Sequence, residues 1–303
     1  MPPHCAEMEG KIMKNIAIVT NFNISDKANA AMKVANYLLK FNCKILVSQY
    51  SKEKVLMNKN YRGNIYFHPV ERLYDEADLV IALGGDGTIL DCAKRMAKRG
   101  KPILGINLGH LGYMAELEID ELDSLSKIIE GDYSIDERKM LNVEVFSKDH
   151  KSKYSSYVLN DAVISNGSVS KIINLELYAE ESLVTTYRSD GLIISTPTGS
   201  TAYAMSAGGS IADPKVECML VTPICPHSFI ARQLIFSDET KIKIKNVSVR
   251  EKMLMLTLDG KTNCEIYRDE YVTITKSDLT VKLVRIKDCS FYDILSQKMK
   301  NNY

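Results

Sequence analysis

The sequence has no excess of either charge, because 39 lysine and arginine residues are balanced by 38 acidic ones, for a formal net charge of +1. Bulk charge therefore gives no general attraction to nucleic acid or membrane, and a polyanion must bind locally if it binds at all. No apolar run is long enough to cross a bilayer. Internal repeats and low-complexity segments are also absent from the sequence.

Metal-binding and disulfide patterns are missing as well. Seven cysteines, at positions 5, 43, 92, 218, 225, 264 and 289, form no C-x-x-C pair and no metal-ligand spacing, and the histidines show none either. The odd count, without a secretory leader, predicts reduced thiols, a cytoplasmic protein and no metal site built from protein side chains. Residues 1–12, ahead of a second methionine, are predicted to be a disordered extension.

Two periodicities divide the rest of the chain. From 14 to about 131, predicted strands at 16–20, 45–47, 79–83 and 103–106 alternate with helices at 28–39, after Thr88 and at 122–129. This alternation is typical of a parallel sheet with helices on its faces, which binds ligands outside the carboxyl ends of its strands.

From about residue 138 the pattern changes to β-rich runs separated by turn residues, which predicts an all-β domain. The predicted strands are 141–146, 154–163, 172–178, 183–187, 192–196, 241–245, 253–258, 271–275 and 281–286. One helix is expected near 201–207, and a final amphipathic helix over 291–300.

The run 79–88 is the most informative local feature, since an apolar strand stops on three glycines that bracket Asp86. Glycine permits both a tight turn and a close approach of the backbone to phosphate oxygens. A carboxylate at such a corner can accept a hydroxyl proton or help to hold Mg²⁺ during phosphoryl transfer. The alternative is structural: the glycines make a strand-to-helix turn and Asp86 caps the helix that follows.

A second polar block, residues 188–209, is rich in glycine, serine and threonine. Two flexible polar loops in one chain suggest two walls of a single cleft. Hydroxyl and backbone N–H groups here can bind a sugar or phosphate, although Ser200 or Thr201 can equally cap a short helix. Tyr203 can offer a flat surface to a base or can lie in the core.

Three shorter signals carry alternatives of their own. Asn160-Asp161 interrupts an apolar β run, so the pair either lies in a bulge or turn or binds a ligand. Residues 105–113 contain three glycines after a predicted strand and can form an ordinary loop. Asp259-Gly260 is the strongest short hairpin signal in the chain and predicts a turn.

Together, residues 83–88, 105–113, 160–161, 188–191 and 195–203 resemble, in order, the motifs of bacterial NAD kinases. The likeness runs from about Lys14 to the tail at 291–293. Gly-Gly-Asp-Gly corners also occur in diacylglycerol kinases, sphingosine kinases and phosphofructokinases, but five motifs in this order are specific. The resemblance implies an α/β Rossmann-like domain at 13–136, joined by a returning tail at 287–303, and a β-rich substrate-binding and oligomerisation domain at 137–286.

The resemblance also implies an activity, the transfer of the γ-phosphoryl group of ATP to the 2′-hydroxyl of the adenosine ribose of NAD. A divalent metal, Mg²⁺, would assist, and the product would be NADP. Asp86 is the candidate base, a role typically worth about 10² to 10⁴ in rate. The phosphate-binding loop would be Gly84, Gly85, Gly87 and Thr88. The expected partners are NAD, ATP and further copies of the chain in a homodimer or homotetramer, in which the β domain can contribute to a neighbour's site; nucleic acid and membrane are not expected.

Substrate contacts follow from the same resemblance. They are expected from Asp86, Gly87, Asn160, Asp161, Arg188, Asp190, Thr198, Thr201, Ala202, Tyr203, Ser206 and Cys225, and from Lys171 and Lys261 at variable positions. The chain departs from the family at Tyr113-Met114, where Phe-Leu is more common, at Asp161, which is often Glu, and at Lys261, which is often Gln. Two alternatives stay open: a lipid or sphingoid kinase of the same superfamily, and a non-catalytic NAD(P)-sensing module.

Overall fold

The structure is a computed structural model that describes residues 12–301 except 110–111, 168–171, 229–230 and 250–252. The chain divides into two compact units, with boundaries between Glu137 and Arg138 and between Thr280 and Val281. The C-terminal segment therefore belongs to the first unit, and this return begins earlier than the expected position after residue 286. Of the predicted extension at 1–12, only Ile12 lies among the described residues.

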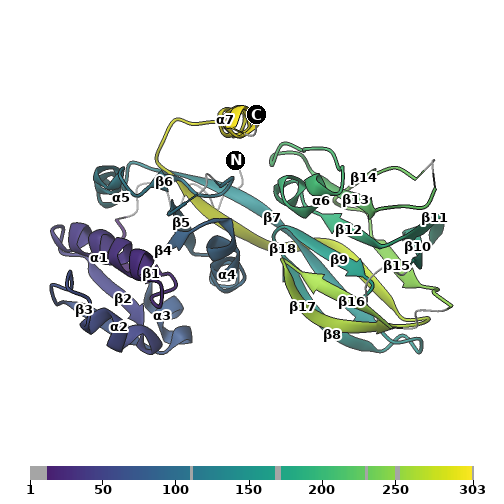
Figure 1. Ribbon diagram of the computed structural model, residues 1–303, viewed down its shortest axis with the longest axis horizontal. Coiled ribbons are helices and arrows are strands. Elements are labelled where there is room, and N and C mark those ends of the chain that lie inside the picture. The colour runs from purple at the N-terminus through teal and green to yellow at the C-terminus, as the bar shows by residue number, and fades with distance from the viewer. Residues whose placement is uncertain (1–11, 110–111, 168–171, 229–230, 250–252, 302–303) are drawn as a thin grey trace. The chain divides into compact units, whose positions relative to one another are not determined.

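The first unit is built on a parallel sheet in the order β5, β4, β1, β2, β3, with the end of β18 beside β5 (Figure 1). Its strands are β1 (Asn15–Val19), β2 (Lys44–Ser48), β3 (Ile65–His68), β4 (Leu79–Gly84), β5 (Pro102–Asn107) and the short β6 (Leu117–Glu118). Its helices are α1 (Ser25–Leu39), α2 (Lys52–Leu56), α3 (Val70–Glu76), α4 (Asp86–Ala97), α5 (Ser126–Glu130) and α7 (Phe291–Asn301), with 3₁₀ turns η1 (Gln49–Ser51) and η2 (Leu122–Leu125). Strand β3 and helices α2 and α3 are not among the predicted elements.

Burial explains why these segments form a layered sheet. Every residue of β4 and β5 is buried, as expected for central parallel strands covered on both faces. Helix α1 buries the face containing Ala28, Met32 and Leu38 in the same core as β1.

The strand order places a topological switch point beside β1, because β2 lies on one side of β1 and β4 on the other. In open parallel sheets ligands bind outside the carboxyl ends of the strands at such a point. Asp86 follows the carboxyl end of β4, so it stands at this location.

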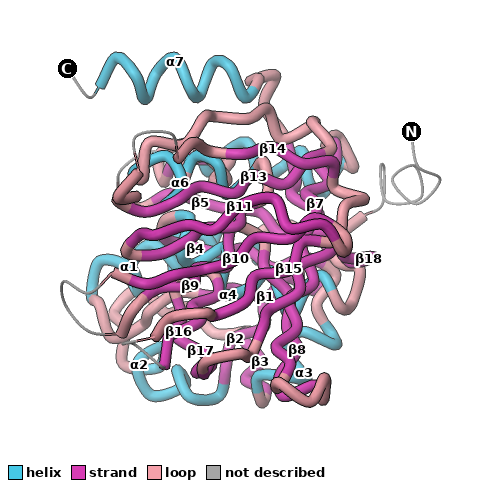
Figure 2. Tube along the Cα trace, turned by 90° about the vertical axis from the view of Figure 1, so that its right-hand side faces the viewer, coloured by secondary structure: helices cyan, strands magenta, loops and turns pink. Residues whose placement is uncertain are grey.

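The second unit is β-rich. One sheet has the order β14, β13, β12, β9, β16, β17. Figure 2 labels β14, β13, β9, β16 and β17 of this sheet from top to bottom. They are β9 (Asp161–Ser165), β12 (Gly191–Ser195), β13 (Cys218–Ile224), β14 (Leu234–Ser237), β16 (Met253–Leu258) and β17 (Lys261–Tyr267). The other strands are β7 (Ser134–Phe146), β8 (Ser152–Val158), β10 (Ile173–Ala179), β11 (Ser182–Ser189), β15 (Ile242–Asn246) and β18 (Tyr271–Arg285). The helical pieces are η3 (Thr198–Thr201) and α6 (Tyr203–Ser206).

The prediction of an all-β domain was right in class and wrong in several strands. The run predicted at 154–163 is two strands, β8 and β9, separated at Leu159-Asn160. The runs predicted at 271–275 and 281–286 are one strand, β18. Strands β13, β14 and β17 were not predicted.

The cysteines and the helices of the described part of the chain bear on two sequence-wide features. The six cysteines found there, which exclude Cys5, are all free, and Cys43, Cys92 and Cys218 are buried. No described helix has both the length and the apolar character needed to cross a membrane.

Candidate active site

Asp86 is held by the loop that follows β5. Its Oδ2 accepts a hydrogen bond from the backbone N–H of Tyr113 at 2.8 Å, and its Oδ1 accepts one from Met114 at 3.1 Å. A carboxylate with two backbone donors is fixed in position. Each oxygen keeps a further lone pair, so the half-buried group can still accept a proton from a hydroxyl.

Gly112 makes this arrangement possible. A Cβ added there would lie 2.2 Å from Oδ1 of Asp86, which is far inside van der Waals contact. The loop can therefore approach the carboxylate this closely only because position 112 has no side chain.

The structural alternative for Asp86 is wrong in its detail. The N-cap of α4 is Gly85, which makes no side-chain capping bond, and Asp86 is the first residue of the helix. The acid therefore lies in the first turn, where a negative charge is favoured, but its hydrogen bonds go to another loop. In the predicted phosphate loop Gly84 is buried, while Gly85 and Gly87 are exposed and a Cβ at either would have no atom within 4 Å. Thr88 is half-buried.

In the second unit Asn160 and Asp161 lie at the turn between β8 and β9, and both are buried. The backbone N–H groups of Leu159, Asn160 and Asp161 all donate to the carboxylate of Asp259, at 3.1, 2.8 and 3.2 Å. The predicted Asp259-Gly260 turn is confirmed, with φ of 49° and 76° joining β16 to β17. Its carboxylate clamp on residues 159–161 was missed, because no local signal links positions about a hundred residues apart.

Burial gives the side chains of Asn160 and Asp161 unusual properties: an unbonded acceptor in one and a raised pKa in the other. The Oδ1 of Asn160 has no hydrogen-bond partner among the described residues, and an orphan buried acceptor suits a ligand donor such as an amide or a hydroxyl. Burial, assisted by the negative charge of Asp259, raises the pKa of Asp161 to about 7. Asp161 can therefore change charge near neutral pH.

The turn after β12 packs directly against Asn160. Thr196 bonds to the Leu159 carbonyl through Oγ1 at 2.6 Å, and its backbone N–H donates to the Asn160 carbonyl at 2.9 Å. A Cβ on Gly199 would lie 2.0 Å from that Asn160 oxygen, so only glycine fits. Thr198 is buried, with Arg138 donating to its Oγ1 at 3.3 Å.

The residues after this turn lead into α6 as predicted, but neither expected cap exists. The N-cap of α6 is Ala202, which makes no side-chain bond. Ser200 donates to the Pro197 carbonyl and accepts from the Ala212 N–H, while Thr201 donates to the Thr198 carbonyl. Ala202 is half-buried, and Tyr203 and Ser206 are exposed.

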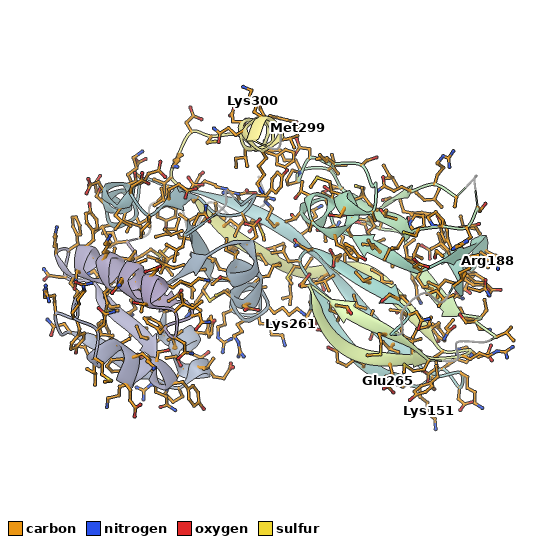
Figure 3. All side chains as sticks on the ribbon, in the orientation of Figure 1. Lys151, Arg188, Lys261, Glu265, Met299 and Lys300 are labelled. Carbon is orange, nitrogen blue, oxygen red and sulfur yellow. The ribbon has the colours of Figure 1, made fainter. Side chains whose placement is uncertain are left out.

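Three expected contact residues, Arg188, Asp190 and Cys225, lie away from Asn160, whereas Lys261 follows the Asp259-Gly260 turn that binds the Asn160 backbone. At one end of β12 Ser195 pairs with Asp161, and at the other end Gly191 pairs with Ile224, beside Asp190 and Cys225. Five residues of strand separate these ends by about 13 Å. Figure 3 shows Arg188 and Lys261, both exposed, on opposite sides of the unit. Lys171 lies outside the described residues.

Across the described residues no group of three or more His, Cys, Asp or Glu side chains could hold a metal ion. Mg²⁺ often binds through one or two carboxylates together with substrate phosphates. Asp86 offers one carboxylate of this kind.

Two family models match the chain. The ATP-NAD kinase N-terminal domain matches residues 16–133, and the ATP-NAD kinase C-terminal domain matches residues 159–286. An NAD kinase of Caldanaerobacter subterraneus subsp. tengcongensis is 35% identical over 288 residues, 95% of this chain and 99% of the relative. An NAD kinase of Carboxydothermus hydrogenoformans is 41% identical over 239 residues, 78% of this chain and 85% of the relative.

Solved structures agree in fold. Yeast NADH kinase complexed with NADH has a TM-score of 0.87 and 25% identity, covering 96% of this chain and 88% of that chain. An Archaeoglobus fulgidus NAD kinase in complex with ATP has a TM-score of 0.70 and 24% identity, a likeness of fold alone, over 95% of this chain and 98% of that chain. With both family models matched and relatives above 30% identity along nearly its whole length, the chain belongs to the ATP-NAD kinase family.

Proposed function

We infer that this chain is an ATP-dependent NAD kinase, and we propose that Asp86 is the general base of its reaction. In this proposal the Asp86 carboxylate takes the proton of the 2′-hydroxyl of the adenosine ribose. The ribose oxygen forms a bond to the γ-phosphorus of ATP, the bond from that phosphorus to the β,γ-bridging oxygen breaks, and ADP leaves. The product is NADP.

One observation carries the proposal: the position of the Asp86 carboxylate, which two backbone N–H groups fix at the carboxyl end of β4, at the switch point of the parallel sheet. Phosphoryl transfer depends mainly on positioning and charge neutralisation, so a fixed acid suits it. Mg²⁺ would supply part of that neutralisation. We propose that Mg²⁺ enters with the ATP phosphates and that the Asp86 carboxylate is the side chain best suited to bind it.

NAD would be recognised in the second unit by the buried polar group around Asn160 and Asp161. The orphan Asn160 Oδ1 can accept from the nicotinamide amide or a ribose hydroxyl, and Thr198, Thr201, Ala202 and Tyr203 follow in the adjoining turn. We propose that Asp190 and Cys225, at the other end of β12, contact a nucleotide bound by a neighbouring copy in a homodimer or homotetramer. The free cysteines and their lack of paired spacing support a cytoplasmic location.

The activity test is direct. The purified chain is incubated with NAD, ATP and Mg²⁺, and NADP is detected with an NADP-specific dehydrogenase. We expect a signal that requires all three components and that chelation of Mg²⁺ with EDTA abolishes. No NADP from folded protein that still binds NAD would instead support a non-catalytic sensing module.

A further inference from the structure

The C-terminal helix α7 brings a lysine to the loop that holds Asp86. The Nζ of Lys298 lies 4.0 Å from the centre of the Tyr113 ring, and the Phe291 ring, at the start of the same helix, lies 6.3 Å from that ring. The backbone N–H of Tyr113 is one of the two donors that hold Asp86. One residue therefore links Lys298 to the proposed catalytic carboxylate within the first unit.

Lys298 differs from the other cation near this loop. Arg285 lies 3.5 Å from the Met114 carbonyl, but its guanidinium is committed to Glu116 at 3.1 Å and Asp136 at 2.9 Å. For Lys298, no carboxylate within ion-pair distance is found in the described part of the chain. A half-buried ammonium group that lies over an aromatic face, with no ion pair to a described carboxylate, keeps its N–H donors for another acceptor.

The electrostatic environment of Lys298 also favours binding of an anion. Burial lowers the pKa of Lys298, and the negative charge of Asp86 opposes this by favouring the charged lysine. The charge of Asp86 therefore acts on Lys298, although the two side chains are not bonded to each other. Holding an unpaired cation partly out of water costs free energy, which an incoming anion would offset.

We propose that Lys298 is a further substrate-contacting residue of the kinase, whose ammonium group binds phosphate oxygens of a nucleotide at the Asp86 loop. This proposal rests on the proposed function, and both nucleotides offer the required chemistry: the triphosphate of ATP and the diphosphate of NAD. A charge-assisted hydrogen bond that is stronger in the transition state would also raise kcat.

Three variants test the proposal in the full-length chain. Lys298→Met keeps the apolar stem and removes the charge, Lys298→Arg keeps the charge, and Lys300→Met is the matched control on an exposed lysine of the same helix (Figure 3). We expect Lys298→Met to lower kcat/KM by about tenfold to a hundredfold, Lys298→Arg to recover most of it, and Lys300→Met to stay within about twofold. The KM that rises, for ATP or for NAD, identifies the nucleotide.

Calorimetric titration with ATP and with NAD gives a second readout that needs no turnover. We expect Lys298→Met to weaken binding of one nucleotide and to leave the other and the unfolding temperature unchanged. Equal loss in Lys298→Met and Lys298→Arg together with a lower unfolding temperature would overturn the proposal in favour of a packing role. Wild-type kinetics and binding in Lys298→Met would also overturn it, whereas a wild-type chain that makes no NADP would overturn the proposed function.

Discussion

Replacing Asp86 with asparagine tests the chemistry and the local structure together. The variant keeps one carbonyl oxygen for the N–H groups of Tyr113 and Met114 and turns an NH₂ group toward the other donor. Losing one charge-assisted hydrogen bond costs about 1.5 to 3 kcal/mol. For a unit of this size that corresponds to a fall of about 3 to 12 °C in its unfolding temperature. Removal of the base is expected to lower kcat by about 10² to 10⁴.

The assay is steady-state NADP formation at saturating ATP, with calorimetric unfolding of the same samples. Asp91→Asn is the matched control, because Asp91 is an exposed acid on the same helix, and we expect it to change kcat by less than about twofold. NAD affinity is expected to change little in Asp86→Asn. Unchanged turnover in Asp86→Asn would refute the assignment of Asp86 as the base.

Three further predictions follow from the contacts of the Asp86 and Asp259 carboxylates. Gly112→Ala retains the carboxylate but displaces it, because the new Cβ would meet Oδ1 at 2.2 Å; we expect kcat, measured in the same assay, to fall at least about tenfold. For Asp161→Asn we expect stability relative to wild type, measured by urea unfolding, to rise by about 2 to 3 kcal/mol between about pH 5 and pH 7.5. Across that window wild-type Asp161 stays largely protonated in the folded state, where its pKa is about 7, while the unfolded chain ionises, so rising pH destabilises only wild type. Asp259→Asn removes a charge beside Asp161 and weakens the clamp on residues 159–161; NMR of the carboxyl carbons should show a lower pKa for Asp161, and NAD should bind more weakly.

Each of these three predictions would be contradicted by a specific result. Wild-type kcat in Gly112→Ala would mean that the loop yields without moving the acid. A pH-independent stability difference for Asp161→Asn would mean that Asp161 is ionised throughout. An unshifted Asp161 in Asp259→Asn would mean that burial alone sets its pKa.

The sequence predicted the parallel sheet well because its signals are local. Runs such as 79–83 are apolar throughout, since helices cover both faces of the strand, and they end at a glycine turn. The β-rich unit was harder, and β13 shows why. Pro223 argues against a central strand, yet β14 pairs with residues 218–221 of β13, so at Pro223 the described part of the sheet pairs β13 with β12 alone.

The predicted strand boundaries were wrong where side chains distant in sequence determine them. The apolar run at 154–163 breaks because Asp259 takes three backbone N–H groups that a continuous ladder would use. Conversely, the polar stretch at 276–280 resembles a turn, but β18 continues through it, with Lys276 paired to Asp238 at 3.1 Å. Neither partner can be found from the local sequence.

For the candidate site, residue identity was predictable and geometry was not. The motif placed Asp86 at the end of a strand, but nothing near it indicated that residues 113 and 114 would donate to its carboxylate. Lys298 was read only as part of an amphipathic helix, because its approach to Tyr113 depends on the return of the C-terminal segment to the first unit.

Both units use one device, a carboxylate that gathers consecutive backbone N–H groups, but with different consequences. In the first unit the clamp, Asp86, is also the proposed base, so substitution should disturb loop order and proton transfer together. In the second unit the clamp, Asp259, binds the backbone of residues 159–161 and leaves the Asn160 Oδ1 unbonded within the described chain. Substitution of Asp259 should therefore raise the KM for NAD with a smaller effect on kcat, while substitution of Asp86 should do the reverse.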